Sequence, residues 1–196
     1  MNRRLIGLTG GIATGKSTVS NYLAQTHNLL ILDADVYARE AVAPDSLILQ
    51  KIFDRYGNKV KSEDGSLNRS ALGEIIFDDI TEKHWLERQV HPYVRERFQQ
   101  ELQRTNDDTV VLDIPLLFEA NLMDTVTEIW VVICDRLKQI ARLQQRNSLS
   151  KTQAEARIDS QIPLSQKVAA ADVILDNNQN LQYLFTQIDV ALKLSN

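Results

Sequence analysis

The sequence predicts an α/β protein, a three-layer α/β/α sandwich with a parallel five-stranded sheet. Five short apolar segments are continuous rather than alternating in hydrophobicity, as is typical of strands covered on both faces. Helical patterns separate them, which favours parallel strands joined by right-handed crossovers. The expected strands are residues 3–9, 28–32, 109–114, 128–134 and 172–175.

The first expected strand runs directly into residues 10–17, which read GGIATGKS. This matches the P-loop pattern, in which backbone N–H groups converge on phosphate oxygens, a lysine adds positive charge and a hydroxyl binds Mg²⁺. A helical pattern follows at residues 18–25, so the positive end of that helix would point at the phosphates. The alternative is a glycine turn with an incidental lysine, but chance would not also supply the strand and the helix. The predicted nucleotide contacts are Gly11, Ile12, Ala13, Thr14, Gly15, Lys16, Ser17 and Thr18.

Length and charge limit the classes of protein that remain. A chain of 196 residues favours one P-loop domain with room for an inserted subdomain. Its net charge of −4 argues against a nucleic-acid partner. No segment approaches the roughly 20 apolar residues that span a membrane, so we expect no membrane partner and a cytoplasmic protein. The apolar run after Arg3 and Arg4 is too short for a signal peptide.

The residues that could bind zinc or form disulfides are few. Cys134 is the only cysteine and ends an apolar run, so we expect a buried strand residue rather than a redox site. His27, His84 and His91 lack the spacing of metal ligands. Zinc is therefore not expected.

The interval between the second and third expected strands is too long for a simple crossover. Within it, helices are expected at residues 44–56, 69–77 and 83–104, the last broken near Pro92 because proline steers the preceding residue away from helical geometry. We therefore expect an inserted helical subdomain in this interval, and we expect it to hold the second substrate. The expected division is a nucleotide-binding core of residues 1–35, 108–140 and 170–196, a substrate-binding insertion of residues 36–107 and a lid of residues 141–169.

Two aspartates follow the second expected strand. An acidic side chain at the carboxyl end of a strand beside the P-loop strand points into the site, so Asp33 could accept a proton from an attacking hydroxyl. Asp35 could act through the metal or fix a substrate group. Both could instead cap the next helix, a role that Asp35 fits better than Asp33.

The third expected strand ends in a second acidic residue and an apolar loop. Asp113 stands where P-loop proteins place the carboxylate that supports Mg²⁺, and Ser17 would supply the hydroxyl ligand. Leu116 and Phe118 follow at the carboxyl end of the strand, where apolar side chains suit contact with a substrate or with the insertion. A role as core residues is equally open.

A basic stretch follows the fourth expected strand. Arg142 and Arg146 lie one helical turn apart on the same face. They could form a solvated helix face. Alternatively, they could belong to a lid whose guanidinium groups bind the transferring phosphate. In that case the catalytic residues would be Arg142, Arg146, Lys16 and Asp33.

Together these features resemble the dephospho-coenzyme A kinases over nearly the whole chain. The matching segments are residues 8–17, the pair Asp33 and Asp35 with Ala38 and Arg39, residues 67–69 with Leu72, Gly73 and Phe77, Leu86 and Glu87 with His91 and Pro92, and DIPLLFE at residues 113–119. The sequence departs from the family pattern at Asn68, where aspartate is frequent, and at residues 176–179, which lack a glycine after the asparagine pair.

The resemblance implies ATP-dependent phosphorylation of the ribose 3′-hydroxyl of dephospho-coenzyme A, the last step of coenzyme A biosynthesis. It implies ATP and Mg²⁺ as cofactors, Asp33 as the base and Asn177 in the wall near the adenine. We also expect a monomer or small homo-oligomer. The implied substrate contacts are Thr9, Asp35, Arg39, His91, Leu116 and Phe118.

Two other functions remain as alternatives. A nucleoside or nucleotide kinase needs the same P-loop, base and lid, and differs in the helical insertion. A GTPase-like switch would require D-x-x-G after the third strand and N-K-x-D for guanine. Here Asp113 is followed by Ile114 and Pro115, and the sequence NKVK at residues 58–61 ends in lysine, which disfavours the switch.

Overall fold

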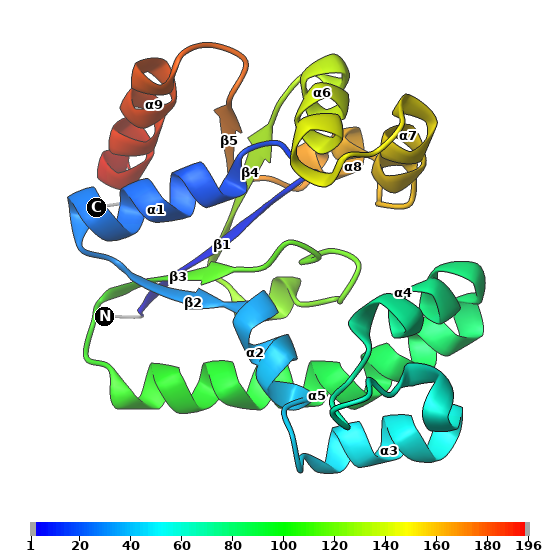
Figure 1. Ribbon diagram of the computed structural model, residues 1–196. Coiled ribbons are helices and arrows are strands. Elements are labelled where there is room, and N and C mark those ends of the chain that lie inside the picture. Colours follow the sequence, from blue (N-terminus) through cyan, green and yellow to red (C-terminus); the bar gives the residue numbers. More distant parts are fainter. Residues whose placement is uncertain (1–2, 195–196) are drawn as a thin grey trace. The chain divides into compact units, whose positions relative to one another are not determined.

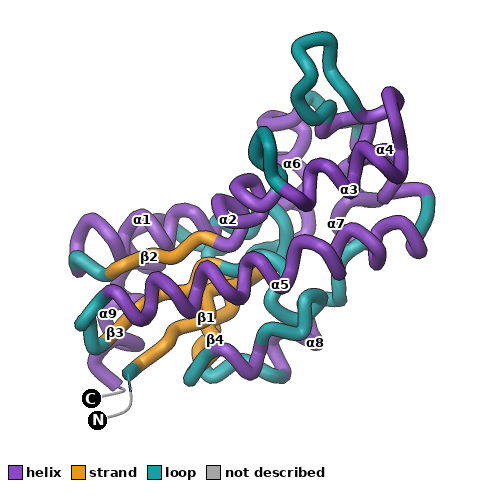
Figure 2. The backbone as a smooth tube through the Cα atoms, turned by 90° about the horizontal axis from the view of Figure 1, so that it is seen from below, coloured by secondary structure: helices purple, strands orange, loops and turns teal. Residues whose placement is uncertain are grey.

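The computed structural model describes residues 3–194, and the chain divides into two compact units. The first, the core unit, contains residues up to Asp33 and from Asp107 onward, and the second, the helical unit, is Ala34–Asn106. The ends of the expected core at residues 1–2 and 195–196 lie outside the described residues. Figures 1 and 2 show the elements of both units.

The core unit is built on five parallel strands in the order β2-β3-β1-β4-β5, which confirms the predicted sheet. In chain order they are β1 (Arg4–Gly10), β2 (Leu30–Asp33), β3 (Thr109–Asp113), β4 (Glu128–Ile133) and β5 (Val173–Asp176). All their pairings are parallel, so the carboxyl ends lie at one edge. Such an edge is where ligands bind in open α/β sheets.

The helices of the core unit are α1 (Lys16–His27), α6 (Arg136–Asn147), α7 (Lys151–Asp159), α8 (Leu164–Ala169) and α9 (Leu181–Leu194), with a short 3₁₀ turn at Met123–Thr125. α1 begins two residues earlier than predicted, which places Lys16 and Ser17 in its first turn. β2 begins two residues later than predicted, because Asn28 adopts a left-handed conformation (φ 52°) and ends α1.

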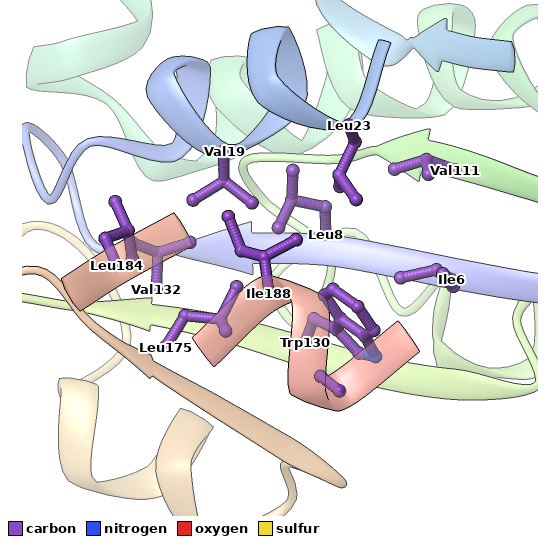
Figure 3. Close-up of a cluster of buried hydrophobic side chains, with 11 residues drawn as sticks. Ile6, Leu8, Val19, Leu23, Val111, Trp130, Val132, Leu175, Leu184 and Ile188 are labelled. Carbon is purple, nitrogen blue, oxygen red and sulfur yellow. The ribbon is translucent and has the colours of Figure 1, made fainter. Parts of the chain in front are cut away.

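The apolar core of this unit lies between the sheet and helices α1 and α9 (Figure 3). Ile6 and Leu8 of β1 meet Val19 and Leu23 of α1, and all four side chains are fully buried. Trp130 of β4 is the largest fully buried side chain there. This packing fixes the direction of α1 relative to β1, and with it the loop that joins them.

The helical unit contains α2 (Ala34–Ala41), α3 (Leu47–Tyr56), a 3₁₀ turn (Gly57–Val60), α4 (Arg69–Asp78) and α5 (Ile80–Arg104). Val42, Ile52, Val60 and Leu72 form its buried cluster. α3 begins later than predicted because Ser46 caps it, accepting a hydrogen bond from the Leu49 N–H at 3.0 Å. Asn68 caps α4 through the Ala71 N–H, so this departure from the family pattern keeps a side chain that can cap.

The predicted break near Pro92 is wrong. α5 runs without interruption through Pro92, and its N-cap, Asp79, accepts hydrogen bonds from Thr81 and Glu82. The helix packs against α2, α3 and α4. Tertiary packing therefore outweighs the local cost of proline inside a helix.

Within residues 3–194, no helix has the length and apolar character needed to cross a membrane. Cys134, as expected, is buried, although it lies one residue beyond the end of β4.

Candidate active site

The glycine-rich loop connects the end of β1 to the start of α1 at the carboxyl edge of the sheet. Gly15 has φ 104°, a left-handed conformation that suits glycine, and a Cβ built there would lie 2.1 Å from Asn177 Nδ2. A Cβ at Gly10 would lie 2.6 Å from the Val132 carbonyl oxygen. Both glycines are therefore required by the close approach of neighbouring groups.

The N-terminus of α1 is arranged to receive an anion. Gly15 provides no side-chain cap, and the first turn contains no acidic residue, so the positive end of the helix is not neutralised from within. Ser17 lies in this turn and is exposed. Backbone N–H groups in this position bind phosphate in many nucleotide sites.

Side chains from outside the loop form hydrogen bonds with the backbone of Ile12 and of Thr14. Ile12 donates its N–H to Gln161 Oε1 at 2.8 Å and accepts from Gln139 Nε2 at 2.7 Å. The Thr14 carbonyl accepts from Asn177 Nδ2 at 2.7 Å and from Arg142 Nη1 at 3.0 Å. Because these hydrogen bonds come from the protein itself, they hold the loop in a fixed conformation, which preorganises it for a ligand.

Two acidic side chains lie beside the loop. Asp33 and Asp113 are direct partners in the register of β2 and β3, and Asp113 is buried. Asp113 forms an ion pair with Lys16 of the loop. Burial raises the pKa of Asp113, whereas the Lys16 ammonium group acts to lower it.

The oxygen donors at this edge suit Mg²⁺. The Ser17 hydroxyl and the Asp113 carboxylate are hard ligands of the kind that Mg²⁺ prefers. Mg²⁺ in nucleotide sites is bound through one or two protein oxygens together with phosphate oxygens and water, which matches this small donor set.

The loop after β3 carries the predicted apolar contacts. Leu116 is exposed and Phe118 is half-buried. Thr9 is fully buried and donates its hydroxyl to the Pro115 carbonyl at 3.1 Å, so in this structure it supports that loop from below rather than presenting a free hydroxyl.

Three predicted substrate contacts belong to the helical unit. Asp35 and Arg39 are exposed on α2, and His91 is half-buried on α5, where burial lowers its pKa. Asp35 does not precede the helix, as a capping role would require. Asp33 occupies that position instead, because α2 begins at Ala34, and this reverses the expected fit of the two aspartates to a cap.

The two predicted lid arginines differ in their surroundings. Both lie on α6, but Arg142 Nη1 also donates to the Ala13 carbonyl at 3.0 Å and contacts Cys134 Sγ at 3.6 Å. Arg146 is exposed, and its Nε donates to Asn147. Arg142 is thus bound to the backbone of the nucleotide loop, whereas Arg146 is directed toward solvent.

Comparison with known proteins decides the family. Residues 4–183 match the dephospho-CoA kinase family. The chain belongs to this family. A dephospho-CoA kinase of Trichormus variabilis is 55% identical over 192 residues, which cover 98% of each chain.

Solved structures agree with the dephospho-CoA kinase assignment. A crystallised protein from Thermus thermophilus is 29% identical, with a TM-score of 0.87, over 100% of this chain and 98% of its own. The dephospho-CoA kinase from Campylobacter jejuni is 28% identical, with a TM-score of 0.70, over 96% of this chain and 95% of its own.

Several residues that shape this candidate site are not predicted from the sequence. Gln139 and Gln161 hold Ile12, and Lys167 forms an ion pair with Glu119. Gln139 and Lys167 lie in helices and Gln161 lies in the bend between α7 and α8, and in a sequence all three look the same as surface residues. Glu119 is the exception, because it ends the DIPLLFE segment, although its partner could not be identified.

Proposed function

We propose that this protein transfers the γ-phosphoryl group of ATP to the ribose 3′-hydroxyl of dephospho-coenzyme A and so produces coenzyme A. The observation that carries the proposal is the grouping of Lys16, Asp33 and Asp113 at the carboxyl edge of the sheet, in a chain of the dephospho-CoA kinase family. These are the groups that phosphoryl transfer needs: a cation, a proton acceptor and a carboxylate for the metal.

The nucleotide is bound by the loop and the first turn of α1, through residues 11–18. In this proposal, Lys16 exchanges Asp113 for phosphate oxygens, since its ammonium group otherwise remains in the ion pair. Asn177 contributes by holding Thr14 in place. When bound, Mg²⁺ would be held by Ser17 and Asp113 and would neutralise phosphate charge.

Asp33 acts on the acceptor. The substrate 3′-oxygen forms a bond to the γ-phosphorus, the bond to the leaving ADP oxygen breaks, and the hydroxyl proton passes to the Asp33 carboxylate. Because such transition states are often loose, orientation of the hydroxyl by Asp33 contributes together with proton transfer.

The remaining roles follow the division of the chain. Residues 36–107 recognise the acceptor through Arg39 and His91, and Asp35, which directly precedes them, contributes as well. The loop after β3 contributes Leu116 and Phe118, with Thr9 supporting that loop. Residues 141–169 serve as the lid. Within it, Arg142 stabilises the nucleotide loop and the transferring phosphate, and Arg146 reaches the phosphate from the exposed face of α6.

The test is an incubation of purified protein with ATP, Mg²⁺ and dephospho-coenzyme A, with mass spectrometry and phosphorus NMR of the product. We expect a single added phosphate on the 3′-oxygen. AMP and adenosine, assayed in parallel, should be poor acceptors. Preferential phosphorylation of either one would instead indicate a nucleotide or nucleoside kinase.

A further inference from the structure

Lys167 of α8 is an unusual residue, because a lysine side chain is almost never fully buried without good reason. Its side chain has 0% exposure, and its Nζ lies 2.8 Å from Glu119 Oε1. Glu119 follows β3 and lies in the same loop as Leu116 and Phe118. The ion pair therefore joins α8 to that loop.

This pair is poorly explained by stability alone. Desolvation of two charges often costs as much as their attraction returns, and an apolar pair of similar size serves stability as well. Moreover, neither Glu119 Oε2 nor Lys167 Nζ has a hydrogen bond of good geometry among the described residues. A role in fixing geometry accounts better for these charges.

The segment just before α8 contacts two loops of the core unit. Ile162 donates its N–H to Glu119 Oε1 at 3.2 Å. The preceding residue, Gln161, accepts the N–H of Ile12 at 2.8 Å. Two consecutive residues thus contact two different loops, the nucleotide loop through Gln161 and the loop after β3 through Ile162.

We propose that Gln161, Glu119 and Lys167 form a latch of positioning residues that holds the nucleotide loop and the loop after β3 in a fixed relation. Lys167 holds the Glu119 carboxylate in place, the carboxylate holds the Ile162 peptide, and this sets Gln161 against Ile12. None of the three needs to touch ATP. The proposal rests on the proposed function, because that function assigns the two loops to the two substrates.

The latch predicts a division of kinetic effects. Loss of the Gln161 acceptor frees only the Ile12 peptide, so it should weaken binding of ATP. Loss of the Glu119–Lys167 pair releases both loops, so it should raise the KM for ATP and also the KM for dephospho-coenzyme A. A purely structural role would lower thermal stability and leave both KM values of the folded protein unchanged.

The test uses Gln161→Met, which keeps side-chain length without the acceptor, and the double variant Glu119→Met with Lys167→Met, which leaves no unpaired charge. Gln166→Leu, on the exposed side of α8, is the matched control. Affinity for a non-hydrolysable ATP analogue is measured by calorimetry, followed by both KM values and a melting curve for each variant.

We expect Gln161→Met to lose about threefold to tenfold in analogue affinity, the range for one lost hydrogen bond, with the KM for dephospho-coenzyme A unchanged. The double variant should raise both KM values, and Gln166→Leu should match the parent protein. Parent-like analogue affinity in folded Gln161→Met would overturn the latch, even if the double variant failed to fold. A parent protein that binds the analogue but leaves dephospho-coenzyme A unphosphorylated would refute the proposed function instead, while the analogue affinities would still decide the nucleotide side of the latch.

Discussion

The polar side chains around the nucleotide loop of the core unit and those on the surface of the helical unit have different partners. In the core unit, Gln139, Gln161, Arg142 and Asn177 direct their polar atoms at backbone groups of the nucleotide loop. In the helical unit, polar side chains pair mainly with each other near the surface, as in Arg55 with Glu82 and Arg97 with Glu40. The difference indicates that substitutions of these four side chains of the core unit affect function, whereas substitutions in these two pairs of the helical unit affect mainly stability.

The glycines of the two units show the same contrast. A Cβ at Gly10, Gly11 or Gly15 of the core unit would lie under 3 Å from another atom, whereas a Cβ at Gly73 of the helical unit would meet nothing within 4 Å. The nucleotide loop is therefore crowded by the groups that shape it. At Gly73 of the helical unit, by contrast, there is space for a side chain.

The largest expected effect is that of Lys16→Ala in the core unit. Turnover should fall by about 10²- to 10³-fold, because the transferring phosphoryl group loses a preorganised positive charge. The protein should remain folded, since the side chain lies at the loop and not in the apolar core. Steady-state kinetics with circular dichroism checks this, and the exposed Lys59→Ala of the helical unit is the control. Near-normal turnover would reject the phosphate-binding role of the loop.

Gly15→Ala and Gly73→Ala compare the two units directly. At Gly15 the left-handed backbone costs roughly 1–3 kcal/mol with a side chain, and the new methyl group collides with Asn177. ATP-analogue affinity should fall at least about tenfold. Gly73→Ala, inside α4, should leave that affinity unchanged and raise stability by up to about 1 kcal/mol, as alanine favours helix. Equal affinities for the two variants would contradict the contrast.

Ile52→Ala and Leu23→Ala remove fully buried side chains, one from each unit. Each should lower the free energy of unfolding by about 2–5 kcal/mol. Below the melting temperature, Ile52→Ala should raise the KM for dephospho-coenzyme A more than that for ATP, and Leu23→Ala should do the reverse. Denaturant unfolding and steady-state kinetics on the same samples give both quantities. Identical KM patterns would show that the two units do not divide the substrates.

The smallest expected effect is a pH dependence in the helical unit. Hydrogen bonds from Arg55 and Tyr56 lower the pKa of Glu82 to about 2. A lowered carboxyl pKa contributes stability above the unfolded pKa of about 4.3, and this contribution is lost as pH falls toward 2. The contribution is small because the pair is partly exposed. The free energies of unfolding of the parent protein and of Glu82→Gln should therefore differ most at pH 6 and converge as pH falls toward 2. A constant difference would show that the charge is not responsible.

More of the structure of the core unit than of the helical unit could be predicted from the sequence. The five buried strands and the GGIATGKS loop have local sequence patterns that identify them without knowledge of the tertiary structure. The sheet could therefore be predicted. The uninterrupted α5 was not, because its packing outweighs the local effect of Pro92. The start of α3 shifted because the Ser46 side chain caps it, and the start of β2 shifted because the left-handed backbone of Asn28 ends α1. Such details depend on single hydrogen bonds and backbone conformations.

Within the site, residues with distinctive chemistry could be predicted, and supporting residues could not. Lys16, Asp33 and Asp113 follow from the P-loop pattern and from the positions of strand ends. Gln139, Gln161 and Lys167 act through contacts with residues far away in the chain, which no local pattern reveals. Thr9 lies at a strand end but is buried beneath Pro115, a distinction that requires three dimensions.

Asp33 is the residue at which the chain passes from one unit to the other, because it ends β2 of the core unit and directly precedes α2 of the helical unit. The most direct test compares Asp33→Asn with the parent protein. Asparagine keeps the size and the capping ability of aspartate but removes the proton acceptor. A capping role alone would therefore leave activity per folded molecule near the parent value.

The deciding measurement is kcat with dephospho-coenzyme A for Asp33→Asn, with ATP-analogue affinity and melting temperature taken from the same preparation. We expect kcat to fall by roughly 10²- to 10⁴-fold, with analogue affinity and melting temperature close to those of the parent protein. A folded Asp33→Asn protein that binds the analogue and turns over at the parent rate would contradict the assignment of Asp33 to catalysis.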